Sequence, residues 1–170
     1  MGTPDLPTEP VLLLRTKLHR PRIPPQLVRR SRLESRLNRG LDRGLVLVSA
    51  PAGFGKTTLV SQWLETCGCP AAWLSLREED SDLPTFLLYL IAAIRTLYPD
   101  ACPETWALLR AQQLPPVAYL ATIFINELDE VPQAFVLVLD DFHRVQSPPV
   151  HQFVETLVDS VPRTLCLVLS

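Results

Sequence analysis

Apolar residues gather in four short runs along the chain, and these runs alternate with segments whose apolar positions follow helical spacing. The runs are only five or six residues long, consist mainly of Leu, Val and Ala, and are bounded by turn residues, which is typical of buried strands. We therefore expect strands at 45–49, 71–76, 134–139 and 165–169.

The segments between these runs carry apolar residues every three or four positions, the spacing of one helical face. A helix is predicted to begin near Pro84, because proline fits the first helical turn without losing a hydrogen bond. In all, we expect helices at 56–66, from Pro84 through Ile94, between Pro103 and Pro115, at 119–128 and at 149–158.

Continuously apolar strands that alternate with helices favour a parallel sheet with helices on both faces. The length of 170 residues suits one such domain, since domains commonly contain about 100–150 residues. We therefore predict a doubly wound α/β domain. Because the strand at 165–169 is the last one, we also expect the sheet to be incomplete at this C-terminal edge, with that strand lacking a neighbour.

The turn after the first strand reads Ala50-Pro-Ala-Gly-Phe-Gly-Lys-Thr57, which matches the P-loop pattern except that alanine replaces the first glycine. Wrapping backbone N–H groups around a phosphate requires Gly53 and Gly55 to adopt angles that a β-carbon resists. Lys56 supplies positive charge, and Thr57 begins a helix, where its hydroxyl can bind Mg²⁺. The competing interpretation is a glycine-rich turn that only caps a helix. The predicted residues for binding ATP or ADP are Ala52, Gly53, Phe54, Gly55, Lys56, Thr57 and Thr58, with Lys56 also catalytic.

Two aspartates, Asp140 and Asp141, follow the third apolar run. P-loop proteins hold Mg²⁺ with the Ser or Thr of the loop and with an acidic residue at the end of an apolar strand. Thr57 and Asp140 are therefore the predicted metal ligands. Asp141 is predicted to be catalytic, because a carboxylate beside the γ-phosphate can orient or deprotonate water. The alternative is that the two aspartates only open a polar loop.

Basic residues are concentrated near the N-terminus. Residues 1–43 contain ten Lys or Arg against four Asp or Glu, although the whole chain has a net charge of −2. Such a segment can bind nucleic acid, yet this one carries many apolar residues that a solvated tail would not need. We therefore predict a basic arm at 1–43 that packs on the nucleotide side of a P-loop domain at 44–170, and keep DNA binding as the alternative.

No apolar run approaches the roughly 18–20 residues of a membrane-spanning helix, and the N-terminus lacks the basic start and apolar core of a secretion signal. These absences predict a cytoplasmic protein. Cys67-Gly-Cys69 has the wrong spacing for a zinc knuckle or a redox pair, so we expect the four cysteines to be reduced.

Several segments together resemble a known family: Thr16-Lys-Leu18, Val28-Arg-Arg-Ser-Arg-Leu33, the P-loop with Trp63, Ala72-Trp-Leu-Ser-Leu76 and Leu137-Val-Leu-Asp-Asp-Phe-His143. They are similar to the N-terminal ATPase region, of the NB-ARC/AAA-like type, of MalT-like large LuxR-type transcriptional regulators in the STAND class.

The resemblance implies a P-loop NTPase fold and a larger regulator with a winged helix, helical repeats and a C-terminal helix-turn-helix. Because these parts are missing, we expect the chain to be a fragment or a truncated product. The resemblance also nominates Val28 and Arg30 as nucleotide contacts. Arg77 departs from the family, which often has aspartate at this position. His143 matches the residue usual in the family, but no catalytic or binding role follows from this match.

These observations predict an ATP-binding, weakly hydrolysing switch domain of a signal-responsive transcriptional regulator. Its expected partners are the nucleotide, the missing C-terminal domains and further copies of itself in an ATP-dependent association, with no direct DNA binding. The first alternative is a stand-alone P-loop enzyme such as a small-molecule kinase, although no polar constellation for a phosphate acceptor is evident. The second is a DNA-binding module that uses the basic arm.

Overall fold

A single parallel sheet organises the protein. The computed structural model describes residues 12–24 and 26–170, and in that part of the chain four strands pair in the order β1-β4-β3-β2. The strands are β1 (Leu45–Leu47), β2 (Ala71–Ser75), β3 (Phe135–Asp140) and β4 (Leu165–Leu169). The predicted α/β class with a parallel sheet is confirmed.

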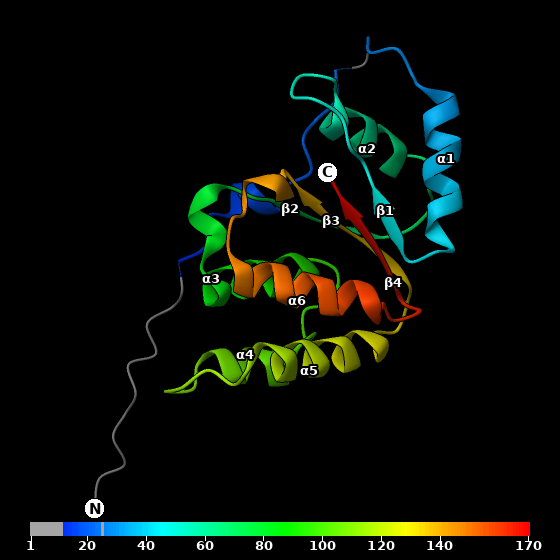
Figure 1. Ribbon diagram of the computed structural model, residues 1–170. Helices are drawn as coiled ribbons and strands as arrows, with labels where there is room; N and C mark the ends of the chain where they lie inside the picture. Colours follow the sequence, from blue (N-terminus) through cyan, green and yellow to red (C-terminus); the bar gives the residue numbers. More distant parts are fainter. Residues whose placement is uncertain (1–11, 25) are drawn as a thin grey trace, which may run out of the picture.

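Helices cover both faces of this sheet (Figure 1). One face carries α1 (Ser31–Leu41), which packs on β1 and α2, and α2 (Lys56–Leu64). The other face carries α3 (Leu83–Arg95) and α6 (Pro148–Asp159), against which pack α4 (Pro103–Leu109) and α5 (Val117–Asp129). The described residues also form three short 3₁₀ helices: η1 (Arg15–Leu18), η2 (Glu78–Ser81) and η3 (Phe142–Arg144).

The two-sided cover explains the unbroken apolar run of β3. All six of its residues are buried, and successive side chains of a strand point to opposite faces. Phe135, Leu137 and Leu139 enter the core beneath α3, α5 and α6, whereas Val136 and Val138 enter the core beneath α1 and α2. A strand covered on only one face would have alternated between apolar and polar residues.

The position of β4 corrects one expectation. The strand at 165–169 was expected to lack a neighbour, but β4 lies inside the sheet between β1 and β3. The outer strands among the described residues are β1 and β2, and Leu47 on β1 is 71% exposed. The order of strands along the chain does not set their order in the sheet, because crossover helices allow a later strand to insert beside an earlier one.

The basic arm contains two elements that were not predicted, η1 and α1. In α1, Leu33, Leu37 and Leu41 recur every four residues, and Leu37 is buried against the sheet side of the helix. That spacing is the signal that would have revealed the helix. Its arginines fill the other face, so the segment looks like a charged tail when only its composition is considered.

The remaining predicted elements agree with the structure apart from their ends. β1 stops at Leu47 and α2 at Leu64, while β3 extends through Asp140. Within residues 12–24 and 26–170, no helix combines the length and apolar character needed to cross a lipid bilayer.

Candidate functional site

The loop between β1 and α2 has the backbone conformation that a phosphate cradle requires. Gly53 and Gly55 have φ angles of 81° and 77°, in the left-handed region where a β-carbon is strained. α2 begins immediately afterwards at Lys56, so its N-terminus and free N–H groups face the loop. Backbone donors and the positive end of a helix dipole together form an anion-binding site.

Lys56 adds a full positive charge to this loop. Its Nζ donates a hydrogen bond to the carbonyl oxygen of Ala50, at 2.9 Å. The side chain therefore folds back across the loop, and its ammonium is held at the start of the turn.

Asp140 is the centre of a small polar cluster at the carboxyl edge of the sheet. The Thr57 hydroxyl lies 3.0 Å from both carboxylate oxygens of Asp140, and the Ser170 hydroxyl lies 2.5 Å from one of them. Asp140 itself is only 4% exposed. The carboxyl ends of parallel strands share one edge, which brings together residues that follow β1, β3 and β4.

This cluster fits a divalent cation. A threonine hydroxyl and a carboxylate are the oxygen ligands that P-loop proteins offer to Mg²⁺, and Thr57 and Asp140 are already in contact. Ser170 was not predicted from the sequence as a member of this cluster. Its signal was a hydroxyl residue directly after the apolar run 165–169, just as Asp140 directly follows the apolar run 134–139.

The Asp141 side chain is oriented differently from that of Asp140. Its φ angle is 58°, so the backbone turns sharply after β3, and its carboxylate lies 3.7 Å from the guanidinium of Arg144 in η3. In the described part of the chain, Asp141 has no hydrogen bond to the P-loop. His143, in the same short helix, is exposed.

Of the two arm residues nominated by resemblance, only Arg30 reaches the loop. Its Nη1 donates to the carbonyl oxygen of Phe54 at 3.1 Å, and its other terminal nitrogen lies 3.8 Å from the place where a β-carbon on Gly55 would be. Val28 is 84% exposed.

A cleft of about 700 Å³ opens beside the P-loop, between α1 and the outer edge of β1. Its volume falls in the range of small-molecule sites, roughly 300–1,000 Å³. Among the residues that the structure describes, the lining contains no carboxylate and five basic side chains: Arg30, Arg36, Arg39, Arg43 and Lys56. The charge of the cleft therefore suits an anionic ligand whose phosphates rest on the loop.

Residues 27–169 match the family described as AAA ATPase domain. The chain belongs to this family. It is therefore a nucleotide-binding domain of the P-loop NTPase fold, as the sequence predicted.

The chain is also similar to two kinds of much larger protein. The serine/threonine-protein kinase PknK of Mycobacterium tuberculosis is 34% identical over 173 aligned positions, which cover 99% of this chain and 15% of the kinase. The HTH-type transcriptional regulator MalT of Klebsiella pneumoniae is 33% identical over 158 positions, which cover 93% of this chain and 17% of the regulator. MalT of Serratia proteamaculans is 34% identical with the same coverage. The chain thus spans about one sixth of the length of these relatives, and the predicted resemblance to MalT-like regulators is confirmed.

Proposed function

We propose that this domain is an ATP-binding switch of a signal-responsive transcriptional regulator, with Mg²⁺ as its metal and slow hydrolysis as the resetting step. The observation that carries the proposal is the contact between Thr57 and Asp140 directly beside a left-handed glycine loop. Membership of the AAA ATPase family supports nucleotide binding, and the similarity to MalT supports the regulatory setting.

In this proposal, the phosphates rest on the N–H groups of residues 52–58 and on the ammonium of Lys56. Thr57 and Asp140 would hold the metal ion, which neutralises charge on the phosphates. The Ser170 hydroxyl donates to Oδ1 of Asp140 and helps to orient the carboxylate. Arg30 adds positive charge at the mouth of the loop, next to the basic cleft.

Slow turnover is consistent with the position of Asp141. Its exposed ion pair with Arg144 is weak, since pairs of this kind contribute about 0–1 kcal/mol, so the pair does not prevent the carboxylate from reorienting toward an attacking water. We expect turnover well below the roughly 10 per second typical of enzymes, because hydrolysis in a switch only resets the state.

Isothermal titration with ATP, in the presence and absence of Mg²⁺, tests the nucleotide site. Lys56→Ala is expected to weaken binding by at least about tenfold, or 1.4 kcal/mol. Arg163→Ala is the matched control, because it removes an exposed positive charge just before β4, at the opposite end of the strands. The proposal fails if the wild-type chain shows no Mg²⁺-dependent affinity for ATP, or if Lys56→Ala binds as tightly as Arg163→Ala.

Thr57→Val tests the metal site separately. The variant keeps the shape of the side chain and removes the hydroxyl that meets Asp140. Magnesium should strengthen ATP binding to the wild type and have a much smaller effect on the variant. An equal effect of magnesium on both proteins would show that Thr57 is not a ligand.

The regulatory setting is tested in the longer protein to which such a domain would belong. ATP and ADP are expected to give different domain arrangements, measured by small-angle scattering or by sedimentation. Identical profiles with the two nucleotides would contradict a switch.

A further inference from the structure

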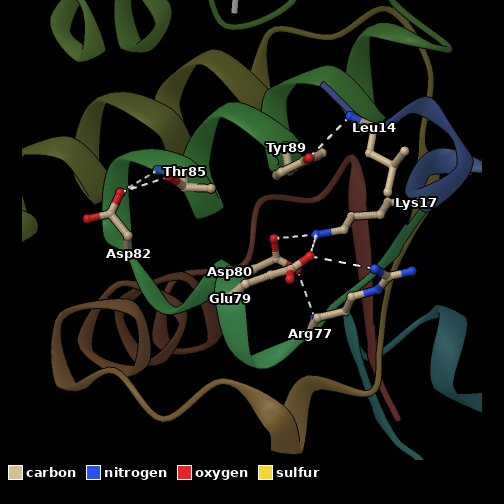
Figure 2. A network of polar contacts seen from close by, with 8 residues as sticks. All are labelled: Leu14, Lys17, Arg77, Glu79, Asp80, Asp82, Thr85 and Tyr89. Atoms are coloured by element: carbon tan, nitrogen blue, oxygen red, sulfur yellow. Dashed lines mark hydrogen bonds and ion pairs between the residues drawn. The ribbon is translucent and has the colours of Figure 1, made fainter. Parts of the chain in front are cut away.

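A buried ion pair fastens η1 of the arm to the rest of the domain (Figure 2). Lys17, in η1, is only 4% exposed. Its Nζ donates to Asp80 at 2.7 Å and to Glu79 at 3.1 Å, and it lies 4.7 Å from the centre of the Tyr89 ring. The ammonium is thus enclosed by two carboxylates and an aromatic face.

Asp80 is itself held rigidly. Its second carboxylate oxygen accepts a hydrogen bond from the backbone N–H of Arg77 at 2.8 Å, which closes the turn between β2 and α3. The backbone N–H of Leu14 donates to the hydroxyl of Tyr89 on α3 at 3.2 Å. Leu14 and Lys17 therefore attach the arm to both the β2–α3 connection and α3.

The ion pair is a strong anchor because neither charge can be hydrated. The side chains of Lys17 and Asp80 are 3% and 2% exposed, so removing Lys17 leaves the charge of Asp80 buried without a counter-ion. Burial lowers the pKa of Lys17, but its hydrogen bonds to Asp80 and Glu79 more than offset this effect, and the pKa lies above its ordinary value. The ammonium consequently stays charged at neutral pH.

From this anchor the arm runs past α2 to the P-loop (Figure 1). The carbonyl oxygen of Pro21 accepts a hydrogen bond from Ser61 on α2 at 2.8 Å. Further on, Arg29 pairs with Glu34 at 2.8 Å. Arg30 then ends the path on the carbonyl of Phe54.

The contact between Arg30 and the P-loop is exposed, and a single exposed hydrogen bond is weak when its partners are free to separate. The hydrogen bond between Arg30 and Phe54 persists when the rest of the arm holds the Arg30 guanidinium at a high effective concentration near the loop. The anchors earlier in the arm provide that restraint, and the Lys17 pair is the most deeply buried of those described here.

We propose that Lys17 is a positioning residue for nucleotide binding, which acts by anchoring the arm so that Arg30 stays at the P-loop. This inference rests on the proposed function, because it assumes that nucleotide binds there. Coupling is reciprocal: if a docked arm favours the nucleotide, bound nucleotide must favour the docked arm.

The test compares Lys17→Met, Lys17→Met with Asp80→Asn, and Arg20→Met. The double variant relieves the buried charge of Asp80 while keeping an acceptor for the Arg77 N–H. Arg20→Met is the control in the same arm, because Arg20 is partly exposed and its ion pair with Glu65 is long, at 4.0 Å. The affinity for Mg²⁺-ATP is measured by titration well below the unfolding temperature, together with hydrogen exchange of residues 14–30.

Both variants that lack Lys17 are expected to bind Mg²⁺-ATP about five- to tenfold more weakly, which corresponds to about 1–1.4 kcal/mol, while Arg20→Met changes affinity by less than about twofold. The double variant should regain thermal stability relative to Lys17→Met without regaining affinity. ATP should slow exchange in the arm of the wild type but not in the arm of the double variant.

Arg30→Ala shows whether Lys17 acts through Arg30. Combined with the double variant, it should lower affinity no further than either change alone, because residues that act through one contact are not additive. Fully additive losses of affinity would overturn the inference. It would also be overturned if the wild type binds Mg²⁺-ATP and the double variant binds it equally tightly. A wild type without Mg²⁺-ATP affinity would overturn the proposed function and this inference with it.

Discussion

Two glycines with nearly identical backbone angles allow the P-loop conformation to be tested apart from general stability. Gly55 has a φ angle of 77° and begins the turn into α2, whereas Gly68 has a φ angle of 73° in the exposed turn between α2 and β2. A β-carbon at Gly68 would meet nothing within 4 Å, and one at Gly55 would approach Arg30 only to 3.8 Å. Replacement by alanine therefore introduces backbone strain at both sites without a steric clash.

The expected magnitude is the cost of holding an L-residue in the left-handed region, about 1–2 kcal/mol. Both Gly55→Ala and Gly68→Ala should lose up to this amount of unfolding free energy. For a chain of this size the loss lowers the melting temperature by up to about 8 °C. Any part of the strain that the Gly55→Ala loop avoids by relaxing must be restored when nucleotide binds, so this variant should bind ATP more weakly, by up to about 30-fold.

Thermal unfolding and titration with Mg²⁺-ATP on the two variants decide the matter. We expect similar melting temperatures and a loss of affinity in Gly55→Ala alone. Equal affinities in the two variants would refute the argument that the left-handed angle of Gly55 shapes the phosphate site. A much larger loss of stability in Gly55→Ala would show that the β-carbon clashes after all.

Three further predictions concern the core, the thiols and the anchor of the arm. Phe124→Ala should lower the free energy of unfolding by about 3–5 kcal/mol, because the ring is fully buried, whereas Tyr119→Ala on the same helix, at a half-exposed position, should stay within about 0.5 kcal/mol in a denaturant titration. Burial raises the pKa of Cys102 to about 12 and that of Cys166 to about 11, so iodoacetamide at pH 8 should label both only after unfolding, and rapid labelling of the native protein, detected by mass spectrometry, would contradict their burial. Burial lowers the pKa of Lys17 but its carboxylate partners raise it more, to above 10.5. The stability difference between wild type and Lys17→Met should therefore persist from neutral pH up to about pH 10.5 and shrink as the pH rises further, and a difference already lost near neutral pH would exclude the ion pair as its source.

The conformation of the loop between β1 and α2 was predictable because its requirements are local. A strand, a turn with glycines at two positions, a lysine and a threonine at a helix start all lie within about a dozen consecutive residues. Backbone angles and the helix N-terminus depend on neighbours along the chain, so residue type and spacing are enough to infer them. The apolar run before Asp140 was informative for the same reason, since a strand covered on both faces must be apolar throughout.

Contacts between distant segments were decided by the tertiary structure. The insertion of β4 between β1 and β3 places Ser170 on Asp140, a pairing that depends on strand order and not on any pattern near either residue. The buried pair of Lys17 and Asp80 joins residues 63 positions apart, and its members look like ordinary surface charges when only their neighbours are considered.

Local chemistry thus determined the conformation of the glycine loop and the α/β class of the domain, because short-range backbone geometry and apolar periodicity are encoded in adjacent residues. Packing decided which polar groups lie beside the loop and how the arm is held against it. The physical reason is that burial and close approach arise only when the crossover connections bring separate strands and helices to the same edge of the sheet, where a charge excluded from water must find its partner.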